Sequence, residues 1–167
     1  FADVNTVYAA GANGTITGLG NEAVTVSGLL TVAQANILAA QTTGVITAAI
    51  SDGDMATLAG LTETGNAYTM TVTDASVAAS ALNTLDSKTT VTVIAIAVNT
   101  ITGTASDVES LYNSSGIIGL GNEDINLFYS YPTAALLKRL DNDTSGTINA
   151  QLLTSIKGKA SDLITIY

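Results

Sequence analysis

Ala105-Ser-Asp-Val-Glu-Ser-Leu-Tyr112 leads directly into Asn113-Ser-Ser-Gly-Ile-Ile-Gly-Leu-Gly-Asn-Glu123, and this double motif occurs more than once in the chain. An earlier copy runs from Ala2-Asp-Val-Asn-Thr-Val-Tyr8, through a slightly longer loop, into Gly18-Leu-Gly-Asn-Glu22. A third copy begins at Ala160-Ser-Asp-Leu-Ile-Thr-Ile-Tyr167. Internal similarity of this kind is typical of repeat proteins, in which neighbouring units stack on one another.

A second internal match is longer and contains no gap. Residues 82–112 correspond to residues 137–167 at a constant offset of 55. Because the sequence opens and closes inside the same repeated element, we expect a segment of a longer repetitive protein; a complete small domain with duplicated helices is the alternative. The matching pairs include Leu82 with Leu137, Leu85 with Leu140, Asp86 with Asp141, Thr89 with Thr144, Gly103 with Gly158, and Tyr112 with Tyr167.

The composition favours a folded protein with a core of small aliphatic side chains. Apolar residues make up 47% of the chain, whereas aromatic residues make up 5% and charged residues 11%. A chain of 167 residues with this content is long enough for a sizeable core and too apolar to be disordered. The absence of Cys excludes disulfides and thiolate metal sites.

The net charge of −9 comes with only five basic residues and no His. Nucleic acids and anionic membrane surfaces attract basic surfaces, so we expect neither of them as a partner. The longest apolar run, residues 91–98, is far shorter than the roughly 20 residues that a membrane-spanning helix needs. We therefore expect no membrane insertion.

Hydrophobic periodicity predicts short strands that alternate with helices. The segment 90–98 is nearly continuous in apolar residues, so we expect a strand that is buried on both faces. The strands are expected at 23–27, 45–50, 67–73, 90–98, 124–128 and 147–150. The helices are expected at 2–10, 32–40, 54–61, from 74 or 76 to 85, from 104 or 106 to 112, at 132–140, and from 161 onward.

Polar residues and one proline are expected to set the helix N-termini. Thr31 is placed to cap the second helix, the stretch Ser51-Asp-Gly-Asp54 to cap the third, and Asp74 or Ser76 to cap the fourth. Pro132 suits the first position of its helix, because its missing N–H has no partner there in any case. The inward face of the second helix is expected to comprise Val32, Ala35, Ile37 and Leu38.

The expected fold class is α/β, as a repeat solenoid of strand-turn-helix units. Each unit is too small to bury its own apolar face, so stacked units would form a parallel sheet on one face and a row of helices on the other, with right-handed crossovers. This is a leucine-rich-repeat-like architecture without the leucine-rich consensus; a compact α/β sandwich is the alternative. The single repeat domain 1–167 would hold a partial repeat at 1–22 and units at about 23–66, 67–122 and 123–167.

Three motifs together resemble repeats of very large surface proteins that marine bacteria, especially cyanobacteria, secrete by the type I route. The motifs are Gly18-Leu-Gly-Asn-Glu22 before a Val-Thr-Val strand, Thr102-Gly-Thr-Ala-Ser-Asp-Val108, and Ala81-Leu-Asn-Thr-Leu-Asp-Ser-Lys-Thr-Thr90. Such proteins are often described as hemolysin-type or calcium-binding. The resemblance implies an extracellular or cell-surface location and a structural or adhesive role. The glycine-rich nonapeptides that bind calcium in these proteins are absent from this sequence.

One stretch reads as a candidate metal site. Asp141-Asn-Asp143-Thr-Ser145-Gly-Thr147-Ile-Asn149 matches the first nine positions of an EF-hand loop, in which Asp141, Asp143, Ser145 and Thr147 would be the Ca²⁺ ligands. Leu152 stands at the twelfth position, where a carboxylate should complete the coordination, and the internal copy replaces the second acid with Lys88. A solvated, Asx-rich turn is therefore the favoured interpretation, and a calcium site the alternative.

Three further features have both a structural and a functional interpretation. Asp3, Asp107 and Asp162 recur in one element and either hold ions between units or favour helix N-termini, and we expect the latter. The two Gly-Leu-Gly-Asn motifs are expected to be turns, because they lack the Lys-Ser/Thr of a phosphate loop. Tyr129 and Tyr131 either cover the core or bind a glycan or another partner, and the former is favoured.

Catalysis has little support in this sequence. Without His or Cys the usual nucleophilic triads cannot form, and no two acids have surroundings that suit a carboxylate-based glycosidase. We expect no enzyme and no certain cofactor. The expected function is a non-catalytic structural or adhesive segment, whose partners are neighbouring repeats of the parent chain or further copies at its open ends. The alternative is a calcium-dependent binding module that uses residues 141–149.

Overall fold

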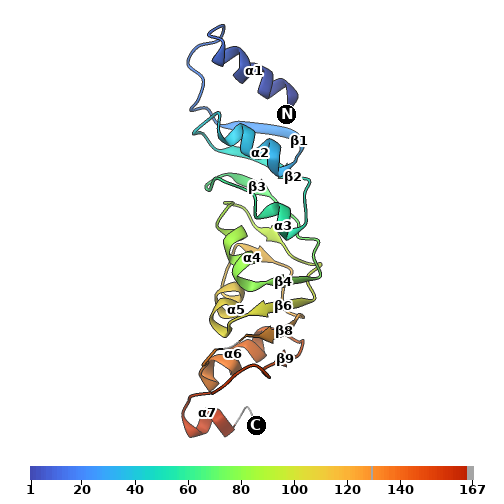
Figure 1. The fold of residues 1–167 in the computed structure, drawn as a ribbon, viewed down its shortest axis with the longest axis vertical. Helices are drawn as coiled ribbons and strands as arrows, with labels where there is room; N and C mark the ends of the chain where they lie inside the picture. The colour runs from blue at the N-terminus through green and yellow to red at the C-terminus, as the bar shows by residue number, and fades with distance from the viewer. Residues whose placement is uncertain (129, 165–167) are drawn as a thin grey trace.

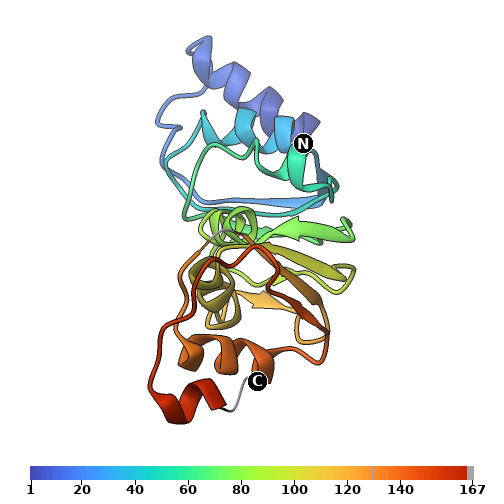
Figure 2. The ribbon, with the colours of Figure 1, turned by 60° about the horizontal axis from the view of Figure 1, so that its bottom comes forward.

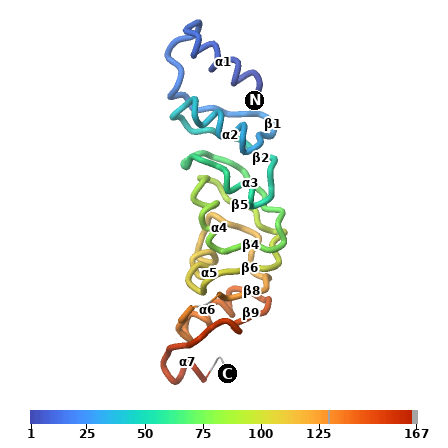
Figure 3. Tube along the Cα trace, viewed as in Figure 1, coloured from blue at the N-terminus to red at the C-terminus, as the bar shows by residue number. Residues whose placement is uncertain are grey.

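The computed structural model describes residues 1–128 and 130–164 as a mixed α/β fold. The elements follow one another along the long axis of the molecule, from α1 near one end to α7 near the other (Figures 1 and 3). Helices α4, α5 and α6 lie along one side and the strands beside them along the other. In chain order the elements are α1 (Ala2–Ala12), β1 (Val24–Leu30), α2 (Val32–Ala39), β2 (Ile46–Ile50), α3 (Met55–Leu58), β3 (Ala67–Thr69), β4 (Ser76–Ala78), α4 (Ala79–Asp86), β5 (Val93–Ile94), β6 (Thr100–Gly103), α5 (Ala105–Tyr112), β7 (Ile117–Ile118), β8 (Asp124–Leu127), α6 (Ala134–Asp143), β9 (Ile148–Asn149) and α7 (Ala160–Ile164).

Every strand pair among the described residues is parallel. The sheets have the orders β1-β2-β3, β4-β6-β8-β9 and β5-β7. Val24 pairs with Ile46, which is 22 residues further along the chain, and Thr100 pairs with Asp124, which is 24 residues further along. Each pairing therefore joins a strand to the strand of the next stretch of chain; one strand with the connection that follows it is called a pass of the chain below. The expected α/β class with parallel sheets is confirmed.

The core lies between the strands and the helices. Strand β1 alternates buried and exposed side chains from Val24 to Ser27, as the sequence pattern predicted, and β2 alternates in a similar way. Helices α4, α5 and α6 each bury three residues spaced three apart, which form one stripe on a helix. The three stripes start with a small residue and continue with larger ones: Ala79, Leu82 and Leu85; Ala105, Val108 and Leu111; and Ala134, Leu137 and Leu140.

The helices also stack on one another in chain order. Helix α5 packs against α4 and α6, and α6 packs against α7. Helix α1 lies beside α2 at the N-terminal end, as Figure 2 shows from another side. The small residue at the start of each buried stripe leaves room for a neighbouring strand, the one that precedes the next helix, to lie close to the helix. A Cβ on Gly103, for example, would lie 3.3 Å from the Cβ of Ala79.

The expected strand at 90–98 is wrong in both length and burial. The only regular strand there is β5, Val93–Ile94, and Ile96 is 70% exposed, so this stretch buries one face rather than two. The chain turns after Ala95 and forms a further strand, β6, which the sequence analysis missed. A continuous apolar run does not reveal such a turn, because residues on both sides of it are apolar.

The expected start of α4 is also wrong. Ser76 belongs to β4, and α4 begins after Ala78, which provides no side-chain cap. The Asp74 carboxylate instead accepts a hydrogen bond from the N–H of Met55, on the preceding helix, at 2.7 Å. Residues 76–78 pair with β6, and this long-range pairing overrides the local helix signal.

The other caps agree with expectation, with one shift. Thr31 accepts from the N–H of Gln34 in a capping box, Asp54 accepts from Thr57, and Thr104 accepts from Asp107. Pro132 is not the first helical residue as expected; it precedes Thr133, which is the N-cap of α6. Ile37, expected to point inward, is 47% exposed, because the buried stripe of α2 is Val32, Ala35 and Leu38.

Candidate functional site

The candidate calcium ligands lie on two different elements. Asp141 and Asp143 belong to the last turn of α6, which extends to Asp143, so the loop expected at 141–146 begins later than the sequence suggested. Ser145 follows in the connection to β9, and its N–H donates to the carbonyl oxygen of Gly121 at 2.9 Å. Thr147 donates through both its N–H and its hydroxyl to Oδ1 of Asp124, each at 2.7 Å.

This arrangement does not fit an EF-hand-type calcium site. Residues two apart on an α-helix point about 200° away from each other, so Asp141 and Asp143 cannot aim at one ion while α6 keeps its last turn. The Thr147 hydroxyl is already bonded to Asp124. Within residues 1–128 and 130–164, no group of three or more acidic side chains is placed to hold a metal ion.

The segment after α6 has a structural task instead. Thr144 donates its hydroxyl to the carbonyl oxygen of Glu123 at 2.7 Å and accepts the N–H of Gly146 at 3.0 Å. A Cβ on Gly146 would overlap that same carbonyl oxygen of Glu123. Residues 144–146 thus lie directly against the Gly119-Leu-Gly-Asn-Glu123 turn of the preceding pass of the chain.

Glu123 is the most deeply buried carboxylate among the described residues, with 0% of its surface exposed. Its oxygens accept the N–H of Gly121 at 2.8 and 3.0 Å and the hydroxyl of Tyr112 at 2.8 Å. Gly121 has a φ of +130°, which an L side chain rarely adopts, so the turn that folds back onto the carboxylate requires glycine there. Through these hydrogen bonds the carboxylate stabilises the turn between α5 and β8.

The first copy of the motif builds the same turn. Glu22 accepts the N–H groups of Gly20, at 2.8 Å, and Asn21, at 3.0 Å. Thr42 donates its hydroxyl to the carbonyl oxygen of Glu22 at 2.7 Å and accepts the N–H of Gly44, as Thr144 and Gly146 do in the later copy. The buried Tyr8 hydroxyl takes the place of Tyr112, although it makes no hydrogen bond of normal geometry.

The surroundings of these turns shift the pKa values of their acidic groups. The adjacent Tyr8 hydroxyl, assisted by the N–H groups of Gly20 and Asn21, lowers the pKa of Glu22 to about 2. Burial, followed by the Glu123 carboxylate, raises the pKa of Tyr112 above its ordinary value. Tyr8 shows a raised pKa mainly through burial. These shifts favour a charged carboxylate at Glu22 and neutral phenols at Tyr8 and Tyr112.

The contacts of Thr42 and Thr144 follow a recurrent pattern that the sequence analysis missed. Ser114 accepts the N–H of Gly116 at 3.0 Å and donates to Oδ2 of Asp86 at 2.7 Å. Thr89 likewise donates to the carbonyl oxygen of Tyr68 and accepts the N–H of Val91. Two hydroxyl residues before an aliphatic strand, usually separated from it by Gly, were the available signal: Thr42-Thr43, Thr89-Thr90, Ser114-Ser115 and Thr144-Ser145.

Two further aspartates accept hydrogen bonds from backbone N–H groups at the starts of helices. Asp52 accepts the N–H of Val32 at 2.7 Å, in the preceding pass of the chain, just as Asp74 accepts that of Met55. Asp3, Asp107 and Asp162 lie in the first turns of α1, α5 and α7, where the helix dipole favours an acid, as expected.

Two hollows lie beside elements of the described part of the chain. The larger, of about 620 Å³, lies between α6, β9 and residues 150–156; the smaller, of about 550 Å³, lies between α1 and the loop that follows it. Asp141 and Lys138 are the only charged residues among the described residues that border them, so neither hollow brings two carboxylates together. The larger is bordered mainly by Leu137, Lys138, Asp141, Ile148, Leu153 and Ile156, and the smaller by Tyr8, Ile16, Leu19 and Gln41.

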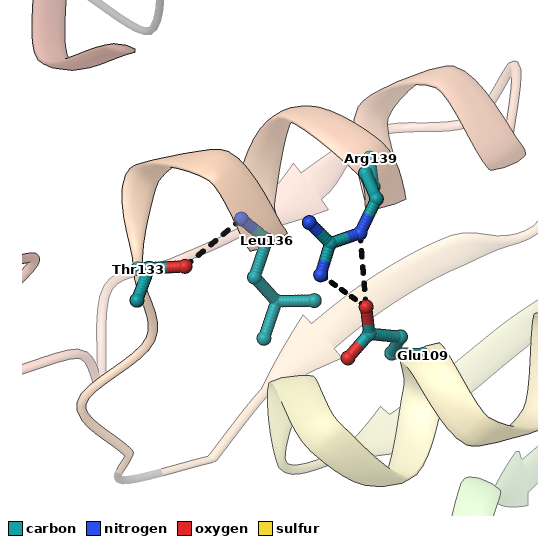
Figure 4. A network of polar contacts seen from close by, with 4 residues as sticks. All are labelled: Glu109, Thr133, Leu136 and Arg139. Atoms are coloured by element: carbon teal, nitrogen blue, oxygen red, sulfur yellow. Dashed lines mark hydrogen bonds and ion pairs between the residues drawn. The ribbon is translucent and has the colours of Figure 1, made fainter. Parts of the chain in front are cut away.

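Two further surface features concern the expected aromatic patch and an ion pair between helices. Tyr131 is 71% exposed and follows the exposed Phe128; Tyr129, the other member of the expected aromatic patch, lies outside the described residues, as does Tyr167. Arg139 of α6 reaches Glu109 of α5 through Nε, at 2.9 Å, and through a second guanidinium nitrogen, while Thr133 caps α6 at the N–H of Leu136 (Figure 4). The Arg139–Glu109 pair joins two neighbouring helices at the surface.

Comparison with protein-family models, with curated proteins and with solved structures found no match to this chain. No helix among the described residues is both long enough and apolar enough to cross a membrane.

Proposed function

We propose that this chain is a non-catalytic structural or adhesive segment of a secreted or cell-surface repeat protein, built as a leucine-rich-repeat-like α/β solenoid. One observation carries the proposal. The Glu22 turn and the Glu123 turn, 101 residues apart in sequence, make the same contacts to the next pass of the chain, through Thr42 and Gly44 in one case and Thr144 and Gly146 in the other. A repeated joint of this kind suits a chain that extends by adding similar units.

The placement of the polar side chains supports a structural role. The buried or half-buried carboxylates Glu22, Glu123, Asp52 and Asp74 bind backbone N–H groups. A catalytic or ligand site instead aims several polar groups into one hollow. The extracellular or cell-surface location rests on the resemblance of the motifs to secreted bacterial repeats.

Small-angle X-ray scattering tests the architecture. A compact α/β sandwich of this length would have a radius of gyration of about 15 Å. A solenoid has a clearly larger value and a distance distribution with a long tail. A compact, symmetric distribution at low protein concentration would overturn the solenoid.

The second candidate is the calcium-dependent binding module that uses Asp141, Asp143, Ser145 and Thr147. The observation in its favour is that Asp141 borders the larger hollow. This function requires the last turn of α6 to unwind, so that both aspartates can face one ion, and calcium-dependent thermal unfolding distinguishes it from the metal-free scaffold.

A further inference from the structure

We propose that one face of the parallel strands binds ice. This outer face consists of the outward side chains of β1, β2, residues 67–73, residues 90–94 and β7, which follow one another along the long axis of the molecule (Figure 3). The proposal rests on the adhesive role proposed above and names the surface to which the segment adheres.

The outer face lies opposite the core, because side chains alternate along these strands. In residues 67–73 the inward side chains of Tyr68, Met70 and Val72 are at most 1% exposed. The outward side chains of the same stretch are three exposed threonines, Thr69, Thr71 and Thr73. Strands β1 and β2 each expose a threonine as well, Thr25 and Thr47. The commonest outward side chain therefore carries one methyl group and one hydroxyl group.

Parallel pairing arranges the outward side chains in rows that cross the strands. Two of these rows are Thr25, Thr47 and Ala67, and Thr71, Ile94 and Ile118. Neighbouring strands of a sheet are about 4.8 Å apart, and successive outward residues of one strand are about 6.6 Å apart. The outer face is thus a two-dimensional array of small side chains, and both spacings are close to repeat distances of the oxygen atoms in hexagonal ice.

No charged residue interrupts the outer face. Residues 23–51, 64–73, 89–106 and 113–122 contain no Asp, Glu, Lys or Arg, although the whole chain has a net charge of −9. All charged residues therefore lie outside the strands of this face. Ice is an uncharged lattice that excludes ions, so a surface that binds it has to be uncharged in the same way.

The threonine hydroxyls of the outer face are free to bind water. The structure shows no hydrogen bond from the hydroxyl to any described residue for Thr25, Thr47, Thr69 and Thr71. By contrast, the buried Thr144 donates its hydroxyl to a backbone carbonyl oxygen. Threonine is stiff about χ1, so the free hydroxyls hold fixed positions. Water beside the methyl groups loses orientational freedom, and hydrogen bonds to the hydroxyls order it further.

A protein or a carbohydrate partner fits the outer face less well than ice does. Protein interfaces concentrate Trp, Tyr and Arg at their centres, and sugars stack on aromatic rings, but the outward positions hold none of these residues. In a dry interface with a second copy, the threonine hydroxyls would lose their water without gaining fixed partners, which costs free energy. An ice lattice satisfies the hydroxyls and also covers Leu29 and Ile118, which are 68% and 47% exposed.

Partition into growing ice tests the proposal on the full chain. Ice is grown slowly in a dilute solution of the protein, and the protein concentrations in the ice and in the remaining liquid are compared. Ice excludes ordinary solutes, so we expect the wild type to be enriched in it. Thr47→Lys and Thr71→Lys each place a charge in one row of the face and should be excluded. Thr84→Lys is the matched control, because Thr84 is an exposed threonine on helix α4.

Melting temperatures establish that the variants fold. Where a lysine variant does not fold, Thr47→Val or Thr71→Val takes its place; these variants keep the shape, remove the hydroxyl and should be enriched less than the wild type. Exclusion of the wild type from ice overturns the proposal whatever the variants do. Equal enrichment of the wild type and of the folded Thr47 and Thr71 variants overturns it as well.

Sedimentation identifies the competing occupant of the face. A wild-type mass that rises with concentration, a monomeric Thr47→Lys protein and no enrichment in ice would make the face an interface between copies instead. If ice excludes the protein while the dilute monomer still scatters as an elongated particle, the solenoid stands and only the binding of ice fails.

Discussion

The hydroxyl of Tyr112 donates a 2.8 Å hydrogen bond to Oε2 of Glu123, a carboxylate with no exposed surface, and so joins the end of α5 to the start of β8. Gly121 supplies the carboxylate with an N–H donor, and Thr144 attaches the next pass of the chain to the carbonyl oxygen of the same residue. The free energy of unfolding is therefore expected to depend strongly on these contacts of Glu123 with Tyr112, Gly121 and Thr144, which we call the joint.

Replacing the buried carboxylate should be costly. Glu123→Ala leaves the N–H of Gly121 and the hydroxyl of Tyr112 without their acceptor in a dry site, and we expect a loss of about 3 kcal/mol in the free energy of unfolding. Glu123→Gln, which keeps one acceptor oxygen, should lose less. Urea denaturation measures both, with the exposed neighbour Asn122→Ala as control. Equal stability of the Glu123→Ala and Asn122→Ala proteins would contradict the proposed joint.

The two tyrosines of the repeated turn should differ in their contribution. Tyr112→Phe removes a donor from a buried carboxylate and should lower the free energy of unfolding by about 2 kcal/mol. Tyr8→Phe removes a hydroxyl that makes no hydrogen bond of normal geometry, so its effect should be smaller. Urea denaturation of the two variants side by side checks the difference, and a larger loss for Tyr8→Phe would count against the geometry described here.

Gly44 and Gly146 should not tolerate a side chain. A Cβ at either position would overlap the carbonyl oxygen of Glu22 or Glu123, and neither backbone can move without breaking the contact between passes. We expect Gly44→Ala and Gly146→Ala each to lose about 3 kcal/mol. Gly14→Ala is the control: its Cβ would meet nothing within 4 Å, so only its φ of +75° opposes alanine, at about 1–2 kcal/mol. Thermal unfolding measures the three variants, and a lower melting temperature for Gly14→Ala than for Gly44→Ala and Gly146→Ala would contradict this prediction.

Stability should fall on acidification through a range set by Glu22. Its pKa is about 2 in the folded protein and 4.5 ordinarily. The folded state therefore binds this proton more weakly than the unfolded state does. The resulting stabilisation is present above about pH 4.5 and is lost as the pH falls toward 2. Melting temperatures of the wild type and of Glu22→Gln, measured from pH 6 to about pH 2, should converge at the acid end, and parallel curves would contradict the shift.

Calcium should leave the thermal stability unchanged. Because Asp141 and Asp143 point away from each other on α6, we expect no rise in melting temperature between EDTA and millimolar calcium. The measurement compares the wild type with Asp143→Ala, and with Asp141→Ala as a matched removal of the other acid. A rise of several degrees in the wild type, abolished by Asp143→Ala, would instead establish the calcium-dependent module and show that the last turn of α6 unwinds.

Part of the fold could be read from the sequence because it depends on neighbouring residues. The alternation in 23–27 is a property of a single strand, and this segment and the expected strand at 45–50 are both strands in the structure. Thr31, Asp54 and Thr104 cap helices through residues three positions away. The local sequence therefore indicated Thr31 directly, Asp54 within the stretch 51–54, and Thr104 as one of two candidates with Ser106. Features that depend on distant partners were missed, such as β4, which forms through pairing with β6.

The sequence by itself determined the α/β class, the recurrence of the Gly-Leu-Gly-Asn-Glu turn and most helix starts. Only the tertiary structure decided which surfaces and donors these elements meet. Glu123 was visible as the last residue of a repeated motif, but its burial comes from Tyr112 and from Thr144, which lies on the next pass of the chain. The stretch from Asp141 to Thr147 has the spacing of a metal loop, yet it continues a helix and then contacts the preceding turn. The physical reason is the same in each case: a periodic pattern records which face of an element is apolar, whereas hydrogen-bond partners some 20 residues away depend on how successive passes stack.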